Sequence, residues 1–243
     1  MSDVCIVGAG AAGCEAARFL ASRGYDVLLV TTSLDTVFSC GAERVVAAMP
    51  TDTFGGSLAP SLRPDSDGTV ASWDVHSAAK YALEATPQVH LLQSNVDDLH
   101  VEERSDGRFV TAVETWEGVP RTARAVLLCV GPFLKASLEV GMAVEAAGRP
   151  GEMAYPELAE ALERFGVALR TERHEGGGGD APTWRGSFAR FAHGVVHDGQ
   201  VRGWQNLFAA GVVVHGPMDY GSAARDGARV ADRVAAWLDA NRS

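Results

Sequence analysis

The feature that most constrains the fold of this sequence is a glycine-rich turn near its N-terminus. Gly8-Ala9-Gly10-Ala11-Ala12-Gly13 follows a short apolar run at residues 3–7 and opens an alanine-rich segment of helical periodicity at residues 11–23. Gly24 ends that segment, and a second apolar run follows at residues 27–30. A strand, a glycine turn, a helix and a second strand in this order predict a dinucleotide-binding unit. The alternative is a glycine and alanine turn that binds nothing.

The rest of the chain predicts a mixed α/β architecture. A helical segment at residues 73–86 stops at Pro87, and the periodicity then changes to that of strands. Residues 38–67 carry several prolines and glycines and are interpreted as a functional loop, and the four glycines at 176–179 as a flexible loop. We expect strands at 89–92, 96–101, 109–115, 125–130 and 207–210, and helices at 157–165 and 222–240.

The glycine turn alone does not identify the cofactor. An acidic residue that binds the adenosine ribose is expected about 20 residues after the turn, at the end of the second strand. The sequence has Thr31, Thr32 and Ser33 there, and no arginine that would accept a 2′-phosphate. A hydroxyl group can still hydrogen-bond to a ribose, so an NAD-dependent dehydrogenase remains a hypothesis, and we rank it third.

The amino-acid composition limits which partners the protein is expected to bind and the cellular compartment in which it is expected to work. The 243 residues include 21 Lys and Arg against 31 Asp and Glu, a formal charge of −10, which disfavours autonomous binding of nucleic acid, including tRNA. The sequence contains no run of 18 apolar residues that would predict a membrane span. Asp3 precedes the first apolar run, which argues against a signal peptide.

Four cysteines without a CxxC pair favour a reducing cytoplasm. His193 and His197 lie in an extended segment, so we expect no metal site.

Six segments, in order along the chain, give the sequence a strong resemblance to a known family. It resembles the FAD-binding core of the GidA family, also called MnmG, whose members are flavin- and folate-dependent tRNA wobble-uridine modification proteins, and more closely the small GidA-related members. That family also ends its second strand in a threonine-containing stretch without an acid. The segments are GAGAAGCEAA at 8–17, LLVTTSLDTVFSC at 28–40, LLQSNVDDLHVEE at 91–103, AVLLCVGPFL at 125–134, GRPG at 148–151 and LFAAGVVVHGPMDYGSAARDG at 207–227.

The resemblance implies a fold class and a domain organisation. We expect an α/β, Rossmann-like FAD-binding fold with three layers and a central parallel sheet that carries a β-meander insertion. We expect residues 1–243 to form a single FAD-binding domain. Its discontinuous core covers about 1–35, 73–134 and 205–243, and smaller insertions occupy 38–67 and 135–204.

The resemblance also implies site residues for FAD. The backbone of Val96 would contact adenine, and Gly211 would end the strand that leads to the ribityl chain and the pyrophosphate. The segment from Asp219 to Ser222 would begin the last helix beside the flavin. Cys40 matches the first functional cysteine of the family, as nucleophile or redox thiol, although a bystander role is equally open. The full set is Gly8, Gly10, Ala11, Ala12, Gly13, Thr31, Thr32, Val96, Gly131, Pro132, Phe133, Gly211, Asp219, Tyr220, Gly221 and Ser222, with Cys40 as the catalytic candidate.

The departures from the family define the alternatives. The Lys-Thr-Gly-Thr-Pro-Pro segment of the family is replaced by Thr171-Glu172-Arg173-His174, and its Gln or Asp after the late Ala-Gly is Val212. Its tRNA-engaging C-terminal region, nicotinamide-associated insertion and second functional cysteine have no counterpart. We therefore favour an FAD-dependent oxidoreductase related to GidA. The alternative is an FAD-carrying module that needs a second chain for substrate or tRNA. The substrate, the electron donor and a homodimer or partner protein are left open.

Overall fold

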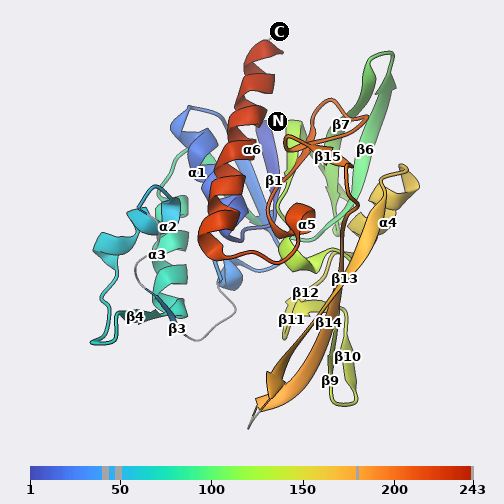
Figure 1. Cartoon of the computed structure of the whole chain (residues 1–243). Helices are drawn as coiled ribbons and strands as arrows, with labels where there is room; N and C mark the ends of the chain where they lie inside the picture. Colours follow the sequence, from blue (N-terminus) through green and yellow to red (C-terminus); the bar gives the residue numbers. More distant parts are fainter. Residues whose placement is uncertain (40–43, 47–50, 179–180, 242–243) are drawn as a thin grey trace.

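A central, mainly parallel sheet organises the molecule. A computed structural model describes residues 1–39, 44–46, 51–178 and 181–241 (Figure 1). Within them the sheet order is β15-β16-β17-β8-β1-β2-β5, and β17, β8, β1, β2 and β5 run parallel. The antiparallel strands β6 and β7 form a meander that joins β8. The bounds are β1 Ser2–Val7, β2 Val27–Thr31, β5 Val89–Gln93, β6 Val96–Arg104, β7 Gly107–Thr115, β8 Val119–Leu128, β15 Val196–His197, β16 Gln200–Val201 and β17 Leu207–Ala209.

Both faces of the parallel strands are buried, which explains their continuous apolar sequences. In β1, Val4 and Ile6 join one core cluster, whereas Cys5 and Val7 join the other. Helices α1, α3 and α6 cover the first face, and the meander and α4 cover the second (Figure 1). These three layers confirm the predicted fold class. The helices are α1 Ala11–Ser22, α3 Ser72–Glu84, α4 Pro156–Arg164, α5 Val212–His215 and α6 Tyr220–Ala240.

Helices α1 and α6 cross in close contact because both carry small residues at the crossing. A Cβ atom on Gly227 would lie 2.2 Å from the carbonyl oxygen of Ala12. Helix α1 ends as predicted at Gly24, whose φ of +85° favours glycine. Asp219 caps α6 by accepting a hydrogen bond of 2.9 Å from the amide of Ser222. The crossing places the start of α6 beside the glycine turn.

The sequence predicts residues 38–67 to be a loop whose prolines and glycines break any long element. The described residues between β2 and α3 form short elements only. Phe54 explains part of the order, because its ring packs edge-on against Phe38 at 5.6 Å and its amide donates to the buried carboxylate of Glu15. The elements are η1 Leu34–Thr36, β3 Arg44–Val46, α2 Phe54–Ser57 and η2 Ala59–Ser61, and β3 pairs with β4 Thr69–Ala71.

A separate four-stranded sheet projects from the body, and we call it the arm (Figure 1). The predicted flexible loop at residues 176–179 is wrong for residues 176–178, because Gly176 and Gly178 pair with Trp184 and Ala181 within a long hairpin of the arm. Residue 179 lies outside the described residues. The ring of Trp184 lies over Gly176, where a Cβ atom would be 2.4 Å from Cζ2. The arm strands, in the order β10-β9-β14-β13, are β10 Ala143–Glu145, β9 Ser137–Val140, β14 Ala181–Phe191 and β13 Leu169–Gly178. A small hairpin, β11 Ala147–Arg149 and β12 Glu152–Met153, and the short helix η3 Gly131–Phe133 lie between arm and sheet.

Membrane-spanning helices, metal-ligand clusters and cysteines can be assessed in the described part of the chain only. No helix in it is long and apolar enough to cross a membrane. It also holds no cluster of three or more potential metal ligands, and His197 lies in a strand as expected. Cys5, Cys14 and Cys129 are buried free thiols. The single-domain organisation stays a prediction.

Candidate functional site

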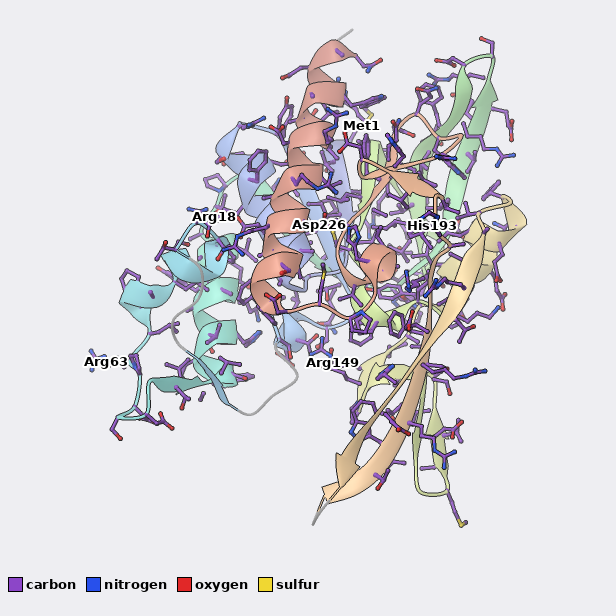
Figure 2. All side chains as sticks on the ribbon, in the orientation of Figure 1. Met1, Arg18, Arg63, Arg149, His193 and Asp226 are labelled. Carbon is purple, nitrogen blue, oxygen red and sulfur yellow. The ribbon has the colours of Figure 1, made fainter. Side chains whose placement is uncertain are left out.

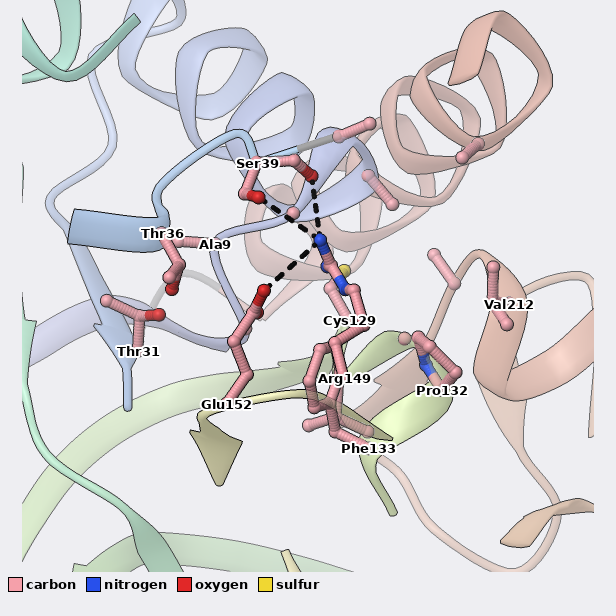
Figure 3. A pocket seen from close by; sticks show the side chains of 18 of the residues that line it. Ala9, Thr31, Thr36, Ser39, Cys129, Pro132, Phe133, Arg149, Glu152 and Val212 are labelled. Carbon is pink, nitrogen blue, oxygen red and sulfur yellow. Dashed lines mark hydrogen bonds and ion pairs between the residues drawn. The ribbon is translucent and has the colours of Figure 1, made fainter. Parts of the chain in front are cut away.

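One cavity lies where four parallel strands end at their carboxyl edge. The chain leaves β1, β2, β8 and β17 there, and residues directly after each strand line the cavity (Figure 3). Its volume is about 140 Å³. Open α/β sheets bind ligands at this edge. Of the predicted residues, the cavity brings together Gly8, Gly10, Ala11, Ala12, Thr31, Thr32, Gly131, Pro132, Phe133, Asp219 and Tyr220.

Glycine occupies the three positions of the turn for different structural reasons. Gly8 has φ +102°, and a Cβ atom there would lie 2.4 Å from the carbonyl oxygen of Cys129. A Cβ atom on Gly13 would lie 1.9 Å from the carbonyl oxygen of Gly8. Gly10 is different, because it has φ −76° and no described protein atom lies within 4 Å of the position of its Cβ. Gly8 and Gly13 therefore serve the fold, whereas Gly10 leaves space in the cavity at the N-terminus of α1, where an anionic group is favoured.

Two threonines occupy the end of β2, where an acidic residue is common in dinucleotide-binding proteins. Thr31 is 5% exposed, and its hydroxyl lies 3.3 Å from the carbonyl oxygen of Ser33. Thr32 and Thr36 also line the cavity. Burial raises the pKa of Tyr155, which lines the wall beside Thr32, so its phenol stays protonated. This part of the cavity therefore offers hydroxyl groups and no carboxylate from β2.

A charged pair on the β11–β12 hairpin lines the cavity and contacts the segment that follows β2. The guanidinium of Arg149 lies 3.4 Å from the carboxylate of Glu152 and 3.1 Å from the hydroxyl of Ser39, and these contacts are drawn in Figure 3. The guanidinium carbon also lies 5.1 Å from the ring centre of Phe133. Burial raises the pKa of Glu152, and Arg149 opposes that shift. Figure 2 shows Arg149 near the junction of the body and the arm.

The sequence did not single out Arg149, Glu152 and Tyr155 as site residues. Arg149 belongs to the GRPG segment at 148–151, which is one of the six segments that carry the family resemblance. That segment was the available signal, but nothing local indicates that its side chain reaches a cavity formed by residues 8–12. The contact depends on how the hairpin folds onto the sheet.

Tyr220 connects the start of α6 to the segment after β2. Its hydroxyl lies 2.8 Å from the carbonyl oxygens of both Phe38 and Ser39. Its ring packs edge-on against Phe38, with centres 5.3 Å apart. Phe38 has φ +55°, which is uncommon for a residue with a side chain. These contacts fix the chain directly before Cys40, which lies outside the described residues.

Five predicted residues do not line this cavity. Gly13 packs against the turn, and Gly221 and Ser222 lie inside the first turn of α6. Gly211 has φ +78°, and its amide donates a hydrogen bond of 2.7 Å to the largely buried carboxylate of Asp226. Asp226 lies on α6 and is labelled in Figure 2. The fifth, Val96, is the first residue of β6 and is fully buried in the second core cluster. Gly211 and Asp226 together shape the turn whose neighbours Ala210 and Val212 do line the cavity.

A second cavity, of about 610 Å³, begins where the first one ends, since Thr32 lines both. It lies at the end of β5 and the start of the meander, and both neighbours of Val96 line it. Burial and the nearby carboxylates, Glu157 foremost, raise the pKa of Asp97. The two cavities follow the same edge of the parallel sheet, from β17 to β5.

The thiols of the described cysteines are poor nucleophiles. Burial raises the pKa of Cys5 to about 12 and raises the pKa values of Cys14 and Cys129 further. Cys129 lines the first cavity but is only 5% exposed. None of the three thiols is therefore suited to thiolate chemistry near neutral pH.

The family described as "Glucose inhibited division protein A" matches residues 3–49 and 68–173. The tRNA uridine 5-carboxymethylaminomethyl modification enzyme MnmG of Chlamydia muridarum is 30% identical over 193 residues, which cover 69% of this chain and 31% of that protein. The MnmG protein of Lactobacillus delbrueckii subsp. bulgaricus is 32% identical over 196 residues, 69% of this chain and 30% of that protein. The chain thus spans about a third of the length of these curated relatives.

Solved structures match over nearly the whole chain. The GidA-related protein from Thermus thermophilus has a TM-score of 0.82 and 32% identity, with 97% of this chain and 98% of that chain covered. Aquifex aeolicus GidA has a TM-score of 0.80 over 99% of this chain and 66% of that chain. Its identity is 14%, so this second likeness concerns the fold alone.

Proposed function

Since the chain belongs to the GidA family, we propose that it is a flavoprotein that binds FAD in an extended pose along the carboxyl edge of its parallel sheet. The family membership confirms the resemblance found in the sequence. The expectation of FAD agrees with the family and with the fold. The observation that carries the proposed site is the convergence of the glycine turn and the ends of four parallel strands on one cavity.

The residues of the first cavity fit the central part of such a cofactor. The pyrophosphate would lie at Gly10 to Ala12, where the backbone leaves open space and the N-terminus of α1 favours negative charge. The hydroxyls of Thr31 and Thr32 would bind the adenosine ribose. A volume of about 140 Å³ is below the range of roughly 300–1,000 Å³ usual for ligand pockets, so the adenosine half would continue past Thr32 into the second cavity.

The opposite end of the first cavity would hold the flavin half. Pro132, Phe133 and Tyr220 line it there, with Val212 and Met218 as apolar neighbours. When bound, FAD supplies the redox chemistry, and the protein supplies binding, orientation and electrostatics. Arg149 would donate hydrogen bonds from the β11–β12 hairpin, held in place by Glu152 and Phe133.

A visible absorption spectrum of the purified protein tests the proposal. Oxidised flavin bound at one equivalent per chain, identified as FAD by mass after release, is the expected result. A protein that purifies colourless and binds NAD but no added FAD would instead support the dehydrogenase hypothesis.

The second candidate is an FAD-carrying module that acts only with another chain. The described lining of the first cavity favours this candidate, because its reactive groups are already engaged or protonated. Arg149 and Glu152 pair with each other, and Cys129 is a buried thiol with a raised pKa. Acid, base or thiolate chemistry would then come from Cys40 or from a partner. Turnover separates the two candidates: an enzyme repeatedly transfers electrons from NADH or NADPH through bound FAD to dioxygen or an added dye as acceptor, whereas the module does so only with a second protein.

The involvement of tRNA belongs to the proposal as well. The curated relatives are tRNA modification enzymes by name. We propose that this chain does not bind tRNA tightly by itself, and that a homodimer or a partner protein would provide any tRNA contact. A reducing compartment stays a prediction, to which the three buried free thiols conform.

A further inference from the structure

The β11–β12 hairpin places a charged pair on the wall of the first cavity. Arg149 and Glu152 pair directly across the hairpin, and Pro150-Gly151 joins them. Gly151 has φ +72°, so the connection is a proline followed by a glycine in the left-handed region, the pattern of a type II turn. Residues that lie opposite each other in a hairpin project from the same face of it. Both side chains therefore reach the same cavity (Figure 3).

The two members of this pair differ in their hydrogen bonds. The guanidinium of Arg149 donates to the hydroxyl of Ser39 at 3.1 Å and to its carbonyl oxygen at 3.4 Å. It lies 3.4 Å from the carboxylate of Glu152 as an ion pair, and no described residue donates a hydrogen bond to that carboxylate. The side chain of Glu152 is 15% exposed. Its negative charge therefore depends on Arg149, because a largely buried carboxylate stays ionised only with a nearby cation or donors.

The charge of Glu152 responds to its surroundings more than that of any other described group in this lining. Burial raises the pKa of Glu152, and the guanidinium of Arg149 lowers it. The neighbouring strands β9 and β14 carry Glu139, Arg185 and Arg190, but none of these three charges shifts the pKa of Glu152. The ion pair with Arg149 is thus the one charge interaction that keeps this carboxyl ionised.

The other titratable side chains of the described lining each keep one charge state near neutral pH. Burial raises the pKa values of Cys129 and Tyr155, so the thiol and the phenol stay protonated. Hydrogen bonds from Ser222 lower the pKa of Asp219, which stays ionised. The hydroxyl of Tyr220 donates to backbone carbonyl oxygens, and a guanidinium is always charged. A charge that appears in the cavity can therefore be balanced by a proton on Glu152.

We infer that Glu152 is a redox-linked proton acceptor, which pairs with Arg149 beside the oxidised flavin and binds a proton when the flavin is reduced. The inference rests on the proposed function, because that function places the flavin half beside Phe133 and Arg149. Glu152 acts through the guanidinium of Arg149, so it is a positioning residue rather than a catalytic one.

The balance of charge explains the coupling. A hydride from a reduced nicotinamide brings two electrons and one proton to the flavin, whose ring gains one negative charge while the nicotinamide is oxidised. That charge attracts the guanidinium of Arg149 and competes with Glu152 for it. Two negative charges beside one guanidinium are unfavourable in a cavity shielded from water, so the carboxylate takes one proton from solvent. Reduction then consumes the hydride and one further proton, and the net charge of the cavity is unchanged.

Potentiometric titration of the FAD-loaded protein measures this proton uptake without turnover. The midpoint potential of the flavin is recorded from about pH 5.5 to about pH 8.5, and each proton bound per two electrons lowers it by about 30 mV per pH unit. The absorption spectrum of the reduced protein shows where the reduced ring is anionic. Within that interval we expect a range of pH in which the unmodified protein binds two protons and Glu152→Gln binds one, so that the potential of the unmodified protein falls twice as steeply.

Two further variants separate this role from folding and from surface charge. Glu152→Asp keeps a carboxylate on a shorter side chain, so it should shift the pH range of the second proton without removing it, and it replaces Glu152→Gln if that variant does not bind FAD. Glu145→Gln removes an exposed carboxylate of the arm and should behave like the unmodified protein. Uptake of a single proton by the unmodified protein throughout the interval, a second proton that survives in Glu152→Gln, or an unshifted range in Glu152→Asp would overturn the inference.

FAD binding distinguishes this failure from failure of the proposed function. If the protein binds FAD but its reduction takes up one proton throughout the interval, only the role of Glu152 is wrong. If the protein purifies without flavin and binds no added FAD, the proposed function fails and the inference fails with it.

Discussion

At the scale of single residues, substitutions can distinguish the roles of the three glycines in the N-terminal turn. Gly8 and Gly13 meet backbone atoms, whereas the Cβ position of Gly10 is open among the described atoms. The dinucleotide fingerprint predicts a tight turn at Gly8, close approach of a pyrophosphate at Gly10 and close packing of the helix on the first strand at Gly13. The structure divides them into two residues that serve the fold and one that leaves room for a ligand.

Replacing Gly10 by valine should abolish FAD binding without unfolding the protein. The backbone of Gly10 has φ −76°, which valine can adopt, so we expect a loss of stability of at most about 1 kcal/mol. The added side chain would occupy the space proposed for the pyrophosphate, and FAD affinity should fall roughly 100-fold or more. Visible absorbance of the purified variant and a thermal melt measure the two effects. Purification of Gly10→Val with a full complement of FAD would contradict the site assignment.

The contrasting substitution is Gly13→Ala. Its Cβ atom would lie 1.9 Å from the carbonyl oxygen of Gly8, so the turn or α1 must move. We expect a loss of stability of about 3 kcal/mol, measured by denaturant unfolding. A melting temperature equal to that of the unmodified protein would show that the turn relaxes more easily than the structure indicates.

Iodoacetamide should alkylate Cys40 in preference to the other three cysteines. Cys5, Cys14 and Cys129 are buried and their thiol pKa values are raised, so little thiolate is present or accessible at about pH 8. Peptide mass mapping, with and without FAD, measures the labelling. Labelling of Cys14 or Cys129 at a comparable rate, or no protection of Cys40 by FAD, would remove the reason to place Cys40 near the flavin. Unchanged turnover in Cys40→Ser would leave it a bystander.

At the scale of elements, aromatic side chains of the arm cover glycines on neighbouring strands. Trp184 covers Gly176, and the ring of His174 covers Gly186, where a Cβ atom would lie 2.6 Å from Nε2. The rings of His174 and Trp184 are in edge contact, with centres 5.2 Å apart. The glycine run could not be recognised as a strand from local sequence, because its stabilising side chains come from the opposite strand of the hairpin.

The arm should become less stable as the pH falls through the titration range of histidine. Burial lowers the pKa of His174, so the unfolded chain, with an ordinary value of about 6.5, binds the proton more readily than the folded one. Stability from this group is therefore present above about pH 6.5 and is lost below it. Between about pH 8 and about pH 5.5, the melting temperature should fall further in the unmodified protein than in His174→Phe, which retains the ring contacts. Equal falls in the two proteins would contradict the assignment.

At the scale of the whole molecule, the formal charge of −10 sets the long-range field. We expect the isolated chain to bind tRNA more weakly than about 1 µM at physiological salt, since binding of nucleic acid depends on phosphate neutralisation. The arginines on α6 do not change this expectation, because Arg225, Arg229 and Arg233 pair with aspartates. A filter-binding titration at several salt concentrations tests it. Sub-micromolar affinity that falls steeply with salt would reveal a basic patch that outweighs the net charge.

The sequence by itself determined the elements and the glycine turn. Hydrophobic periodicity and glycine positions act over a few residues, and they predicted the mixed α/β architecture and most of the helices and strands of its core, whereas the family resemblance implied the Rossmann-like fold. Eleven of the predicted site residues line one cavity for the same reason: they directly follow strands or open helices at one edge of the sheet.

Only the tertiary structure decided what closes that edge. Arg149 reaches Ser39 across 110 positions of sequence, and Tyr220 reaches Phe38 across 182. Such contacts carry no local signal, because they arise when packing of apolar faces brings separate elements together, and the polar side chains at the margins then pair with whatever that packing places within reach.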